Sequence, residues 1–129
     1  MDDIREWWIK TEREYTVPVT GIFEVKSCRK EKWEAEDEAW NLMESALKTA
    51  DVDKYEIYET RDIVPCKEGH KVTLSVDFVI YSIGDDATDA WGHAETLVEN
   101  ISLPDNVELV GTEQHELVEE NERMLIVGE

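Results

Sequence analysis

The sequence predicts an α+β fold in which a strand–helix–strand unit occurs twice and contributes to one antiparallel sheet. Residues 38–47 align with residues 89–98, and the segment after each also aligns, 53–60 with 105–112. A helix-like segment followed by the same strand-like segment indicates an internal repeat. The expected order is β-α-β-β-α-β, the split βαβ or ferredoxin-like arrangement, with both helices on one sheet face and extra terminal strands.

Two long segments show the alternation of a strand with one buried face. The first has apolar residues or glycine at every second position, Tyr15, Val17, Val19, Gly21, Phe23 and Val25. The second does the same with Val72, Leu74, Val76, Phe78 and Ile80. Side chains alternate across a strand, so each set lies on one face. Pro18 cannot donate a ladder hydrogen bond and predicts an edge strand or a bulge, and Gly21 marks a further candidate bulge.

Two helices are predicted from apolar residues spaced three and four apart. Their stripes are Ala39, Met43, Ala46, Leu47 and Ala50 in the first, and Ala87, Ala90, Ala94, Leu97, Val98 and Ile101 in the second. The acidic residues at the start of each predicted helix interact favourably with the positive end of the helix dipole. Asp37, Asp85 and Thr88 are candidate N-caps.

We expect a single domain over residues 1–129, because one core of this length buries enough surface to be stable. Residues 1–14 are a strand or a short helix, repeat one spans 15–64 and repeat two spans 71–127. Turns are predicted at residues 67–69 and 119–122, each joining two strands of a hairpin.

The net charge of −19 comes from 32 Asp and Glu against 13 Lys and Arg. Such a charge repels nucleic acid and anionic membranes, and it attracts basic proteins. The absence of a long apolar run and the acidic start predict a cytoplasmic protein. The alternative is that the charge serves only solubility or a salt-rich cytoplasm.

The usual motifs of catalysis and metal binding are missing from the sequence, so we expect no enzyme, no cofactor and no metal. Cys66 and His70 face each other across a turn, but zinc normally takes four ligands, and Cys28, His93 or His115 would have to complete the set. Buried, inert and reduced thiols are the expectation for both cysteines.

The five tryptophans divide into two groups. Trp40 and Trp91 occupy matched repeat positions beside the apolar stripes, which predicts core packing. Trp7, Trp8 and Trp33 are candidates for anchoring a partner or a second copy of the chain, since exposed aromatic residues often do so. The alternative is that these three cover the second face of the sheet.

The first strand, residues 15–25, and the acidic helix start at residues 34–40 resemble a pattern common in small acidic proteins of bacteriophages and mobile elements. The resemblance covers about 25 residues, and the insertion of residues 27–33 departs from it. It brings no functional residues, because the group is of unknown function. It implies a phage or mobile-element origin, where small acidic inhibitors of host defence or nucleic-acid-handling proteins are frequent.

The function expected from these features is a non-enzymatic, acidic protein-binding module. Its partner would be a basic protein surface, including one that otherwise holds nucleic acid, in the manner of a nucleic-acid mimic. The partner-binding residues expected are Trp33, Glu34, Glu36, Asp37, Glu38, Glu44, Asp85, Asp86, Asp89, Glu95 and Glu99. The alternatives are a ligand-sensing regulator that forms a homodimer and a structural or assembly component of a phage particle.

Overall fold

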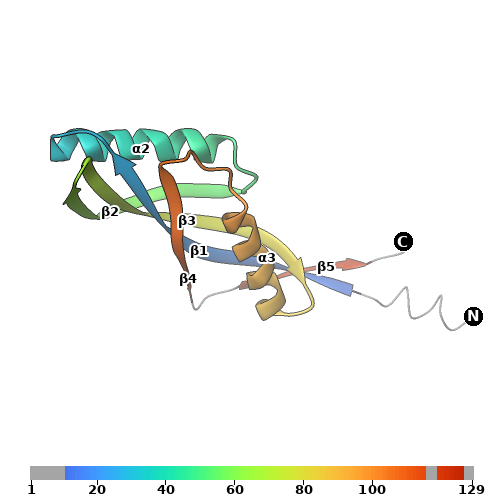
Figure 1. Ribbon diagram of the computed structural model, residues 1–129. Helices are drawn as coiled ribbons and strands as arrows, with labels where there is room; N and C mark the ends of the chain where they lie inside the picture. The colour runs from blue at the N-terminus through green and yellow to red at the C-terminus, as the bar shows by residue number, and fades with distance from the viewer. Residues whose placement is uncertain (1–10, 116–118, 127–129) are drawn as a thin grey trace, which may run out of the picture.

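A computed structural model describes residues 11–115 and 119–126, and the prediction for residues 1–14 lies mostly outside this part (Figure 1). The elements follow in the order β1 (Thr11–Ser27), α2 (Lys32–Lys48), β2 (Lys54–Cys66), β3 (Gly69–Gly84), α3 (Ala87–Glu99), β4 (Val107–Gln114) and β5 (Glu119–Ile126). The fold is α+β, with two strand–helix–strand units in tandem, as the sequence predicts.

The strands form one antiparallel sheet in the order β2-β3-β1-β4, and β5 pairs with β1. This is the ferredoxin-like order that the split βαβ pattern predicts. If β1 is exchanged with β3 and β2 with β4, the same strand order results when it is read from the other edge. The two strand–helix–strand units therefore occupy equivalent positions in the sheet. β5 is an extra strand beside the first half of β1, where Thr11 pairs with Ile126.

β1 is a central strand, which corrects the edge position predicted from Pro18. It pairs with β3 along its whole length after residue 12. On its other side, described pairing with β5 ends at Thr16 and pairing with β4 begins at Val19. Pro18 lies between these two described stretches of pairing, so its missing N–H interrupts neither of them. The described register shifts on this side fall between Arg13 and Tyr15 and between Ile22 and Phe23, rather than at Gly21.

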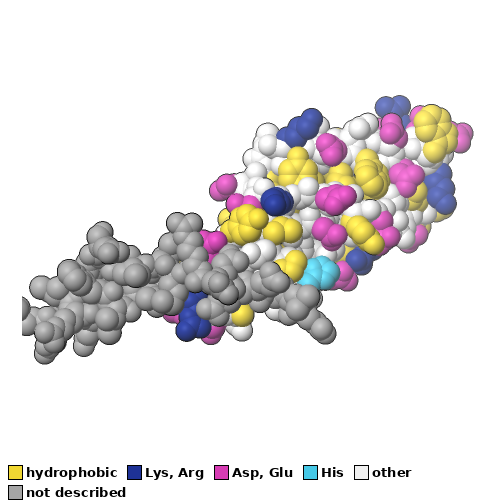
Figure 2. Space-filling model, turned by 180° about the vertical axis from the view of Figure 1, so that it is seen from behind, with side chains coloured by type: hydrophobic (Ala, Val, Ile, Leu, Met, Phe, Trp, Pro, Cys, Tyr) yellow, Lys and Arg dark blue, Asp and Glu magenta, His cyan; other side chains and the backbone are white. Residues whose placement is uncertain are grey.

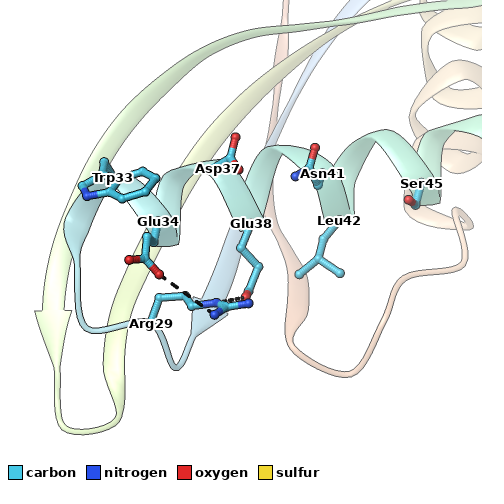
Figure 3. A pocket seen from close by; sticks show the side chains of 8 residues that line it. All are labelled: Arg29, Trp33, Glu34, Asp37, Glu38, Asn41, Leu42 and Ser45. Atoms are coloured by element: carbon cyan, nitrogen blue, oxygen red, sulfur yellow. Dashed lines mark hydrogen bonds and ion pairs between the residues drawn. The ribbon is translucent and has the colours of Figure 1, made fainter.

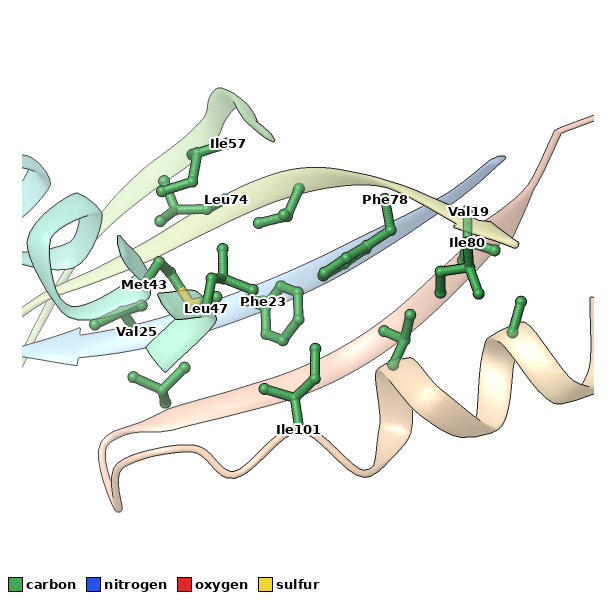
Figure 4. Packing of buried hydrophobic residues seen from close by; sticks show 14 of the residues in the cluster. Val19, Phe23, Val25, Met43, Leu47, Ile57, Leu74, Phe78, Ile80 and Ile101 are labelled. Carbon is green, nitrogen blue, oxygen red and sulfur yellow. The ribbon is translucent and has the colours of Figure 1, made fainter. Parts of the chain in front are cut away.

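The core lies between the helices and one face of the sheet, and it contains the alternating residues of β1 and β3 (Figure 4). α2 contacts β1, β2 and β3, whereas α3 contacts β1, β3 and β4. The rings of Phe23 and Phe78 lie with their centroids 6.3 Å apart. A Cβ atom at Gly21 would lie 2.8 Å from the Phe23 ring, so the glycine makes room for this aromatic pair.

The helix boundaries differ from the prediction. α2 begins at Lys32, so Asp37 lies in its second turn, and its N-cap residue Glu31 makes no side-chain hydrogen bond to the helix. α3 is capped by Asp86, whose carboxylate accepts a hydrogen bond from the Asp89 amide at 2.8 Å, and neither Asp85 nor Thr88 has that role.

The helix stripes are largely as expected, with local exceptions. Ala87 and Leu97 are exposed, while Ala35, which the prediction left out, is buried. Trp40 and Trp91 pack half-buried against the core, and the Trp40 indole donates a hydrogen bond to Thr60.

The turn between β2 and β3 is at the predicted place, with residues 67 and 68 between the strands. The turn predicted at residues 119–122 is wrong, because these residues belong to β5. Residues 54–66 form one continuous strand, which extends the strand-like segment of residues 53–60 up to the β2–β3 turn.

Candidate functional site

The outward face of α2 combines an exposed aromatic side chain with a row of acidic residues. The buried residues of α2 are Ala35, Ala39, Met43, Ala46 and Leu47. Residues spaced three and four apart from Trp33 therefore point away from the core, and Asp37, Asn41 and Glu44 are exposed. We call the surface formed by Trp33, Glu36, Asp37, Asn41 and Glu44 the α2 face.

Trp33 is 67% exposed, the highest value among the large hydrophobic side chains that the structure describes. It lies in the first turn of α2, just after the loop that follows β1. Because most of the indole surface is in contact with water, covering it with a partner removes apolar surface from water and favours binding. It is the aromatic residue best placed to meet a partner in the described part of the chain.

Two shallow hollows lie on either side of Trp33. The first, with a volume of about 430 Å³, is lined by residues of α2 and the preceding loop, Arg29, Trp33, Glu34, Asp37, Glu38, Asn41, Leu42 and Ser45 (Figure 3). The second has a volume of about 580 Å³ and is lined by Trp33, Glu36, Asp37, Trp40, Asn41 and Glu44. Both hollows therefore present carboxylates beside the indole.

Arg29 neutralises part of this acidic surface. Its guanidinium donates a hydrogen bond of 2.8 Å to Glu38 and lies 4.0 Å from Glu34 (Figure 3). The hydrogen bond and the charge of Glu38 raise the pKa of Arg29. In the described part of the chain, no ion pair involves Glu36, Asp37 or Glu44. These three carboxylates are the free charges of the α2 face.

Most of the acidic residues predicted on the second helix form hydrogen bonds within the local structure. Asp86 caps α3, and the Asp85 amide donates a hydrogen bond of 3.2 Å to the carboxylate of Asp89. Glu95 accepts a hydrogen bond of 3.0 Å from Thr112 on β4. Glu99 is exposed in the last turn of α3. Local structure therefore accounts for Asp86, Asp89 and Glu95.

The predicted acidic residues form two groups rather than one surface. Ser27 at the end of β1 pairs with His70, whereas Arg13 pairs with Gly84 at the far end of the same ladder. α2 begins shortly after Ser27, and α3 begins shortly after Gly84, so the two helices start at opposite ends of the long β1–β3 pair (Figure 1). Among the residues that the structure describes, only the group around Trp33 has an exposed indole beside it.

Sequence reasoning missed several residues of this site. Asn41, Leu42 and Ser45 line the hollows, and Arg29 is the local counter-ion. The spacing of Asn41 from Trp33, two helical turns, is a signal that could have found it. The pairing of Arg29 with Glu38 depends on how the loop turns back onto the helix, which the spacing does not show. Trp7 and Trp8, the other predicted anchors, lie outside the described residues.

The second face of the sheet carries a polar network among apolar side chains. The Thr20 hydroxyl donates to Asp77 at 2.8 Å and also contacts Nε2 of His115, while Arg61 forms an ion pair of 2.7 Å with Glu113. The hydrogen bond to Arg61 lowers the pKa of Glu113. Seen from behind, hydrophobic groups are interspersed with acidic and basic ones (Figure 2). Tyr81 and Ile83 are exposed on β3.

The thiols and the metal-ligating side chains also depart from expectation. Cys28 and Cys66 are both exposed free cysteines, so the predicted burial is wrong. Each lies at or just beyond the end of a strand, where the core does not reach. Among the residues that the structure describes, no three His, Cys, Asp or Glu side chains are grouped closely enough to hold a metal ion. None of the described helices is long and apolar enough to cross a membrane.

Comparison of the chain with protein-family models, with curated proteins and with solved structures finds no match. The function is therefore inferred from the geometry of the α2 face.

Proposed function

We propose that the α2 face binds an arginine- or lysine-rich segment of another protein. The observation that carries the proposal is Trp33, 67% exposed and placed beside the unpaired carboxylates of Glu36, Asp37 and Glu44. A flat indole and nearby carboxylates suit a guanidinium group, which stacks on aromatic rings and forms bidentate bonds with carboxylates.

Two effects contribute to binding at this surface. Covering most of an indole of 150–250 Å² contributes about 3 kcal/mol through burial of apolar surface. The net charge of −19 adds long-range attraction for a basic partner, which raises the association rate at low salt. The indole therefore supplies most of the affinity, and the carboxylates supply selection for a basic partner.

The proposed module is non-enzymatic and acts in the cytoplasm. A basic surface that holds DNA or RNA is a suitable partner, because it is already arranged to bind a row of negative charges. The resemblance to small acidic phage proteins extends the proposal to a phage-encoded inhibitor that occupies such a surface on a host protein. The row of carboxylates along one helix supports this reading.

Reversing the charges of the α2 face should weaken binding of a fluorescently labelled deca-arginine peptide. In the variant Glu36→Lys/Asp37→Lys/Glu44→Lys, we expect the Kd at low salt to rise about tenfold or more, since each close charge pair contributes roughly 0.5 kcal/mol or more. Fluorescence anisotropy of the peptide measures the Kd, and the affinity of the native chain should fall as salt is added.

A matched variant separates the α2 face from net charge alone. Glu56→Lys/Glu59→Lys/Glu108→Lys changes the charge by the same amount, from −19 to −13, at exposed positions on β2 and β4. We expect its Kd to change less than about threefold, because screening limits the reach of a charge to roughly 10 Å. Equal losses in the two variants would show that the acidic surface as a whole attracts the peptide, and the proposed site would be wrong.

The open face of the sheet supports a second candidate, a homodimeric ligand-sensing regulator. Tyr81 and Ile83 are 44% and 38% exposed on β3, on the same side of the strand as Asp77. Two such faces could pair around a small ligand. Sedimentation analysis distinguishes the two: a stable dimer that Tyr81→Asp dissociates favours the regulator, and a monomer at all concentrations favours the peptide-binding module.

A further inference from the structure

A cavity at one end of the sheet brings together the two cysteines of the chain. Its volume is about 500 Å³, and it lies where the end of β1, the loop after it and the β2–β3 turn meet. The cavity is lined by Lys26, Ser27, Cys28, Cys66, Lys67, Glu68, Lys71, Asp105 and Asn106. Cys28 and Cys66 are far apart in the sequence, so the fold itself places them together.

Gly69 is the residue that lets the two cysteines approach. Cys66 pairs with Gly69 at the start of the β2–β3 hairpin. A Cβ atom on Gly69 would lie 2.8 Å from the Cα atom of Cys28, so the backbone of Cys28 rests directly on the glycine. Since paired strands hold their Cα atoms about 5 Å apart, those of Cys28 and Cys66 are separated by roughly 10 Å at most.

We propose that Cys28 and Cys66 form a site of reversible oxidation, which peroxide closes into an intramolecular disulfide. Both thiols are free and exposed, so an oxidant can reach them. A disulfide requires Cα atoms within about 7 Å, so Cys28 and Cys66, which flank Gly69, come closer by up to about 3 Å when the bond forms. The loop of residues 28–31 lies outside the helices and strands, which allows the movement.

The oxidation proceeds in two balanced steps. The thiolate of one cysteine attacks an oxygen of hydrogen peroxide, the O–O bond breaks, and a sulfenic acid forms as hydroxide leaves and takes up a proton. The second thiol then attacks the sulfenic sulfur, the S–S bond forms, and a second water leaves. The two thiols lose two electrons and two protons, and the peroxide is reduced to two waters. Lys26, Lys67 and Lys71 line the cavity together with Glu68 and Asp105, so charged groups of both signs surround the thiols.

The site is adjacent to the α2 face. Arg29 directly follows Cys28 and holds Glu38 at 2.8 Å, so movement of the loop shifts the guanidinium that neutralises this carboxylate. That coupling rests on the proposed function, whereas the oxidation itself does not.

Intact-mass analysis after treatment with hydrogen peroxide tests the site independently of any binding partner. We expect the folded chain to lose two hydrogens, proteolytic mapping to link the peptides that contain Cys28 and Cys66, and dithiothreitol to restore the mass. The variants Cys28→Ser and Cys66→Ser should each show no such loss and instead gain oxygen on the remaining thiol. Oxygen addition or intermolecular dimers in the native chain, without the loss of two hydrogens, would overturn the proposal.

A second measurement shows whether the fold positions the thiols. The same chain unfolded in guanidinium separates the cysteines by a flexible segment, so we expect the disulfide to form roughly tenfold faster in the folded chain. Equal rates in the two states would mean that the cavity contributes nothing, and the proposed site would then be rejected.

Discussion

The substitution Gly69→Ala should lower the free energy of unfolding by about 3 kcal/mol or more, since overpacking against rigid atoms typically costs roughly 1–3 kcal/mol and sometimes exceeds this. The added methyl group would lie 2.2 Å from the Ser27 carbonyl oxygen and 2.8 Å from the Cys28 Cα atom. Both are backbone atoms, so no side chain can rotate away. Urea denaturation followed by circular dichroism measures the change, which is a large share of the roughly 5–15 kcal/mol that stabilises a domain.

The control for this prediction is Gly92→Ala. Gly92 lies inside α3, and a Cβ atom there meets nothing within 4 Å. Alanine favours the helix over glycine, so the control should raise the free energy of unfolding by about 0.5–1 kcal/mol. If Gly69→Ala were as stable as the native chain, the close approach of the Ser27–Cys28 backbone to the β2–β3 hairpin would be wrong.

The substitution Trp33→Ala should raise the Kd of the deca-arginine peptide about thirtyfold, the effect of losing an interface anchor worth roughly 2 kcal/mol. The indole is mostly exposed, so its removal should leave the unfolding midpoint almost unchanged. Loss of binding with retained stability is the pattern expected of a contact residue. Anisotropy gives the Kd, and thermal unfolding gives the stability.

Tyr58→Ala is the matched control for Trp33. Tyr58 is 62% exposed on β2, so it is a comparable aromatic residue on a different element. We expect the Kd to change less than about twofold, within the range of an exposed residue outside the interface. A similar loss from both substitutions would indicate non-specific contact of the peptide with exposed aromatic residues. An unchanged Kd in Trp33→Ala would remove the anchor from the proposed site.

The sheet could be predicted in detail because burial in a strand is a local property of alternate residues. Each of Tyr15, Val17 and Val19 is buried, as the period of two requires. Which strands pair with a given strand, in contrast, depends on distant parts of the sequence. Pro18 suggested an edge, yet β5 and β4, which pair with β1 before and after Pro18, come from residues about a hundred positions later in the chain.

The helix starts were predicted less well, because acidic residues surround both of them. Asp85, Asp86 and Thr88 are all able to cap a helix, and only the backbone path selects Asp86. At α2 the sequence offers Asp37, but the helix begins five residues earlier without a side-chain cap. The amphipathic stripe continues through Ala35, and its burial stabilises the extra turn.

The candidate site was predicted in part. Trp33 and the acidic residues of α2 lie on one helix, so their proximity follows from the helical repeat alone. The separation of Asp85, Asp86 and Asp89 from them follows from the length of β3, which carries the chain to the other end of the sheet. The prediction for Cys28 and Cys66 failed because cysteine is usually a core residue, while their exposure depends on where the strands end.

The sheet order makes the two halves of the chain depend on each other during folding. β1 and β2 belong to the first strand–helix–strand unit but are separated by β3, and β3 and β4 of the second unit are separated by β1. Neither half can close a strand pair alone, so a nascent chain ending before Gly69 holds unpaired strands with exposed apolar faces. Such interlocked topologies fold slowly because distant segments must meet first. In that interval, mutual repulsion among the many carboxylates helps to keep unfinished chains from aggregating.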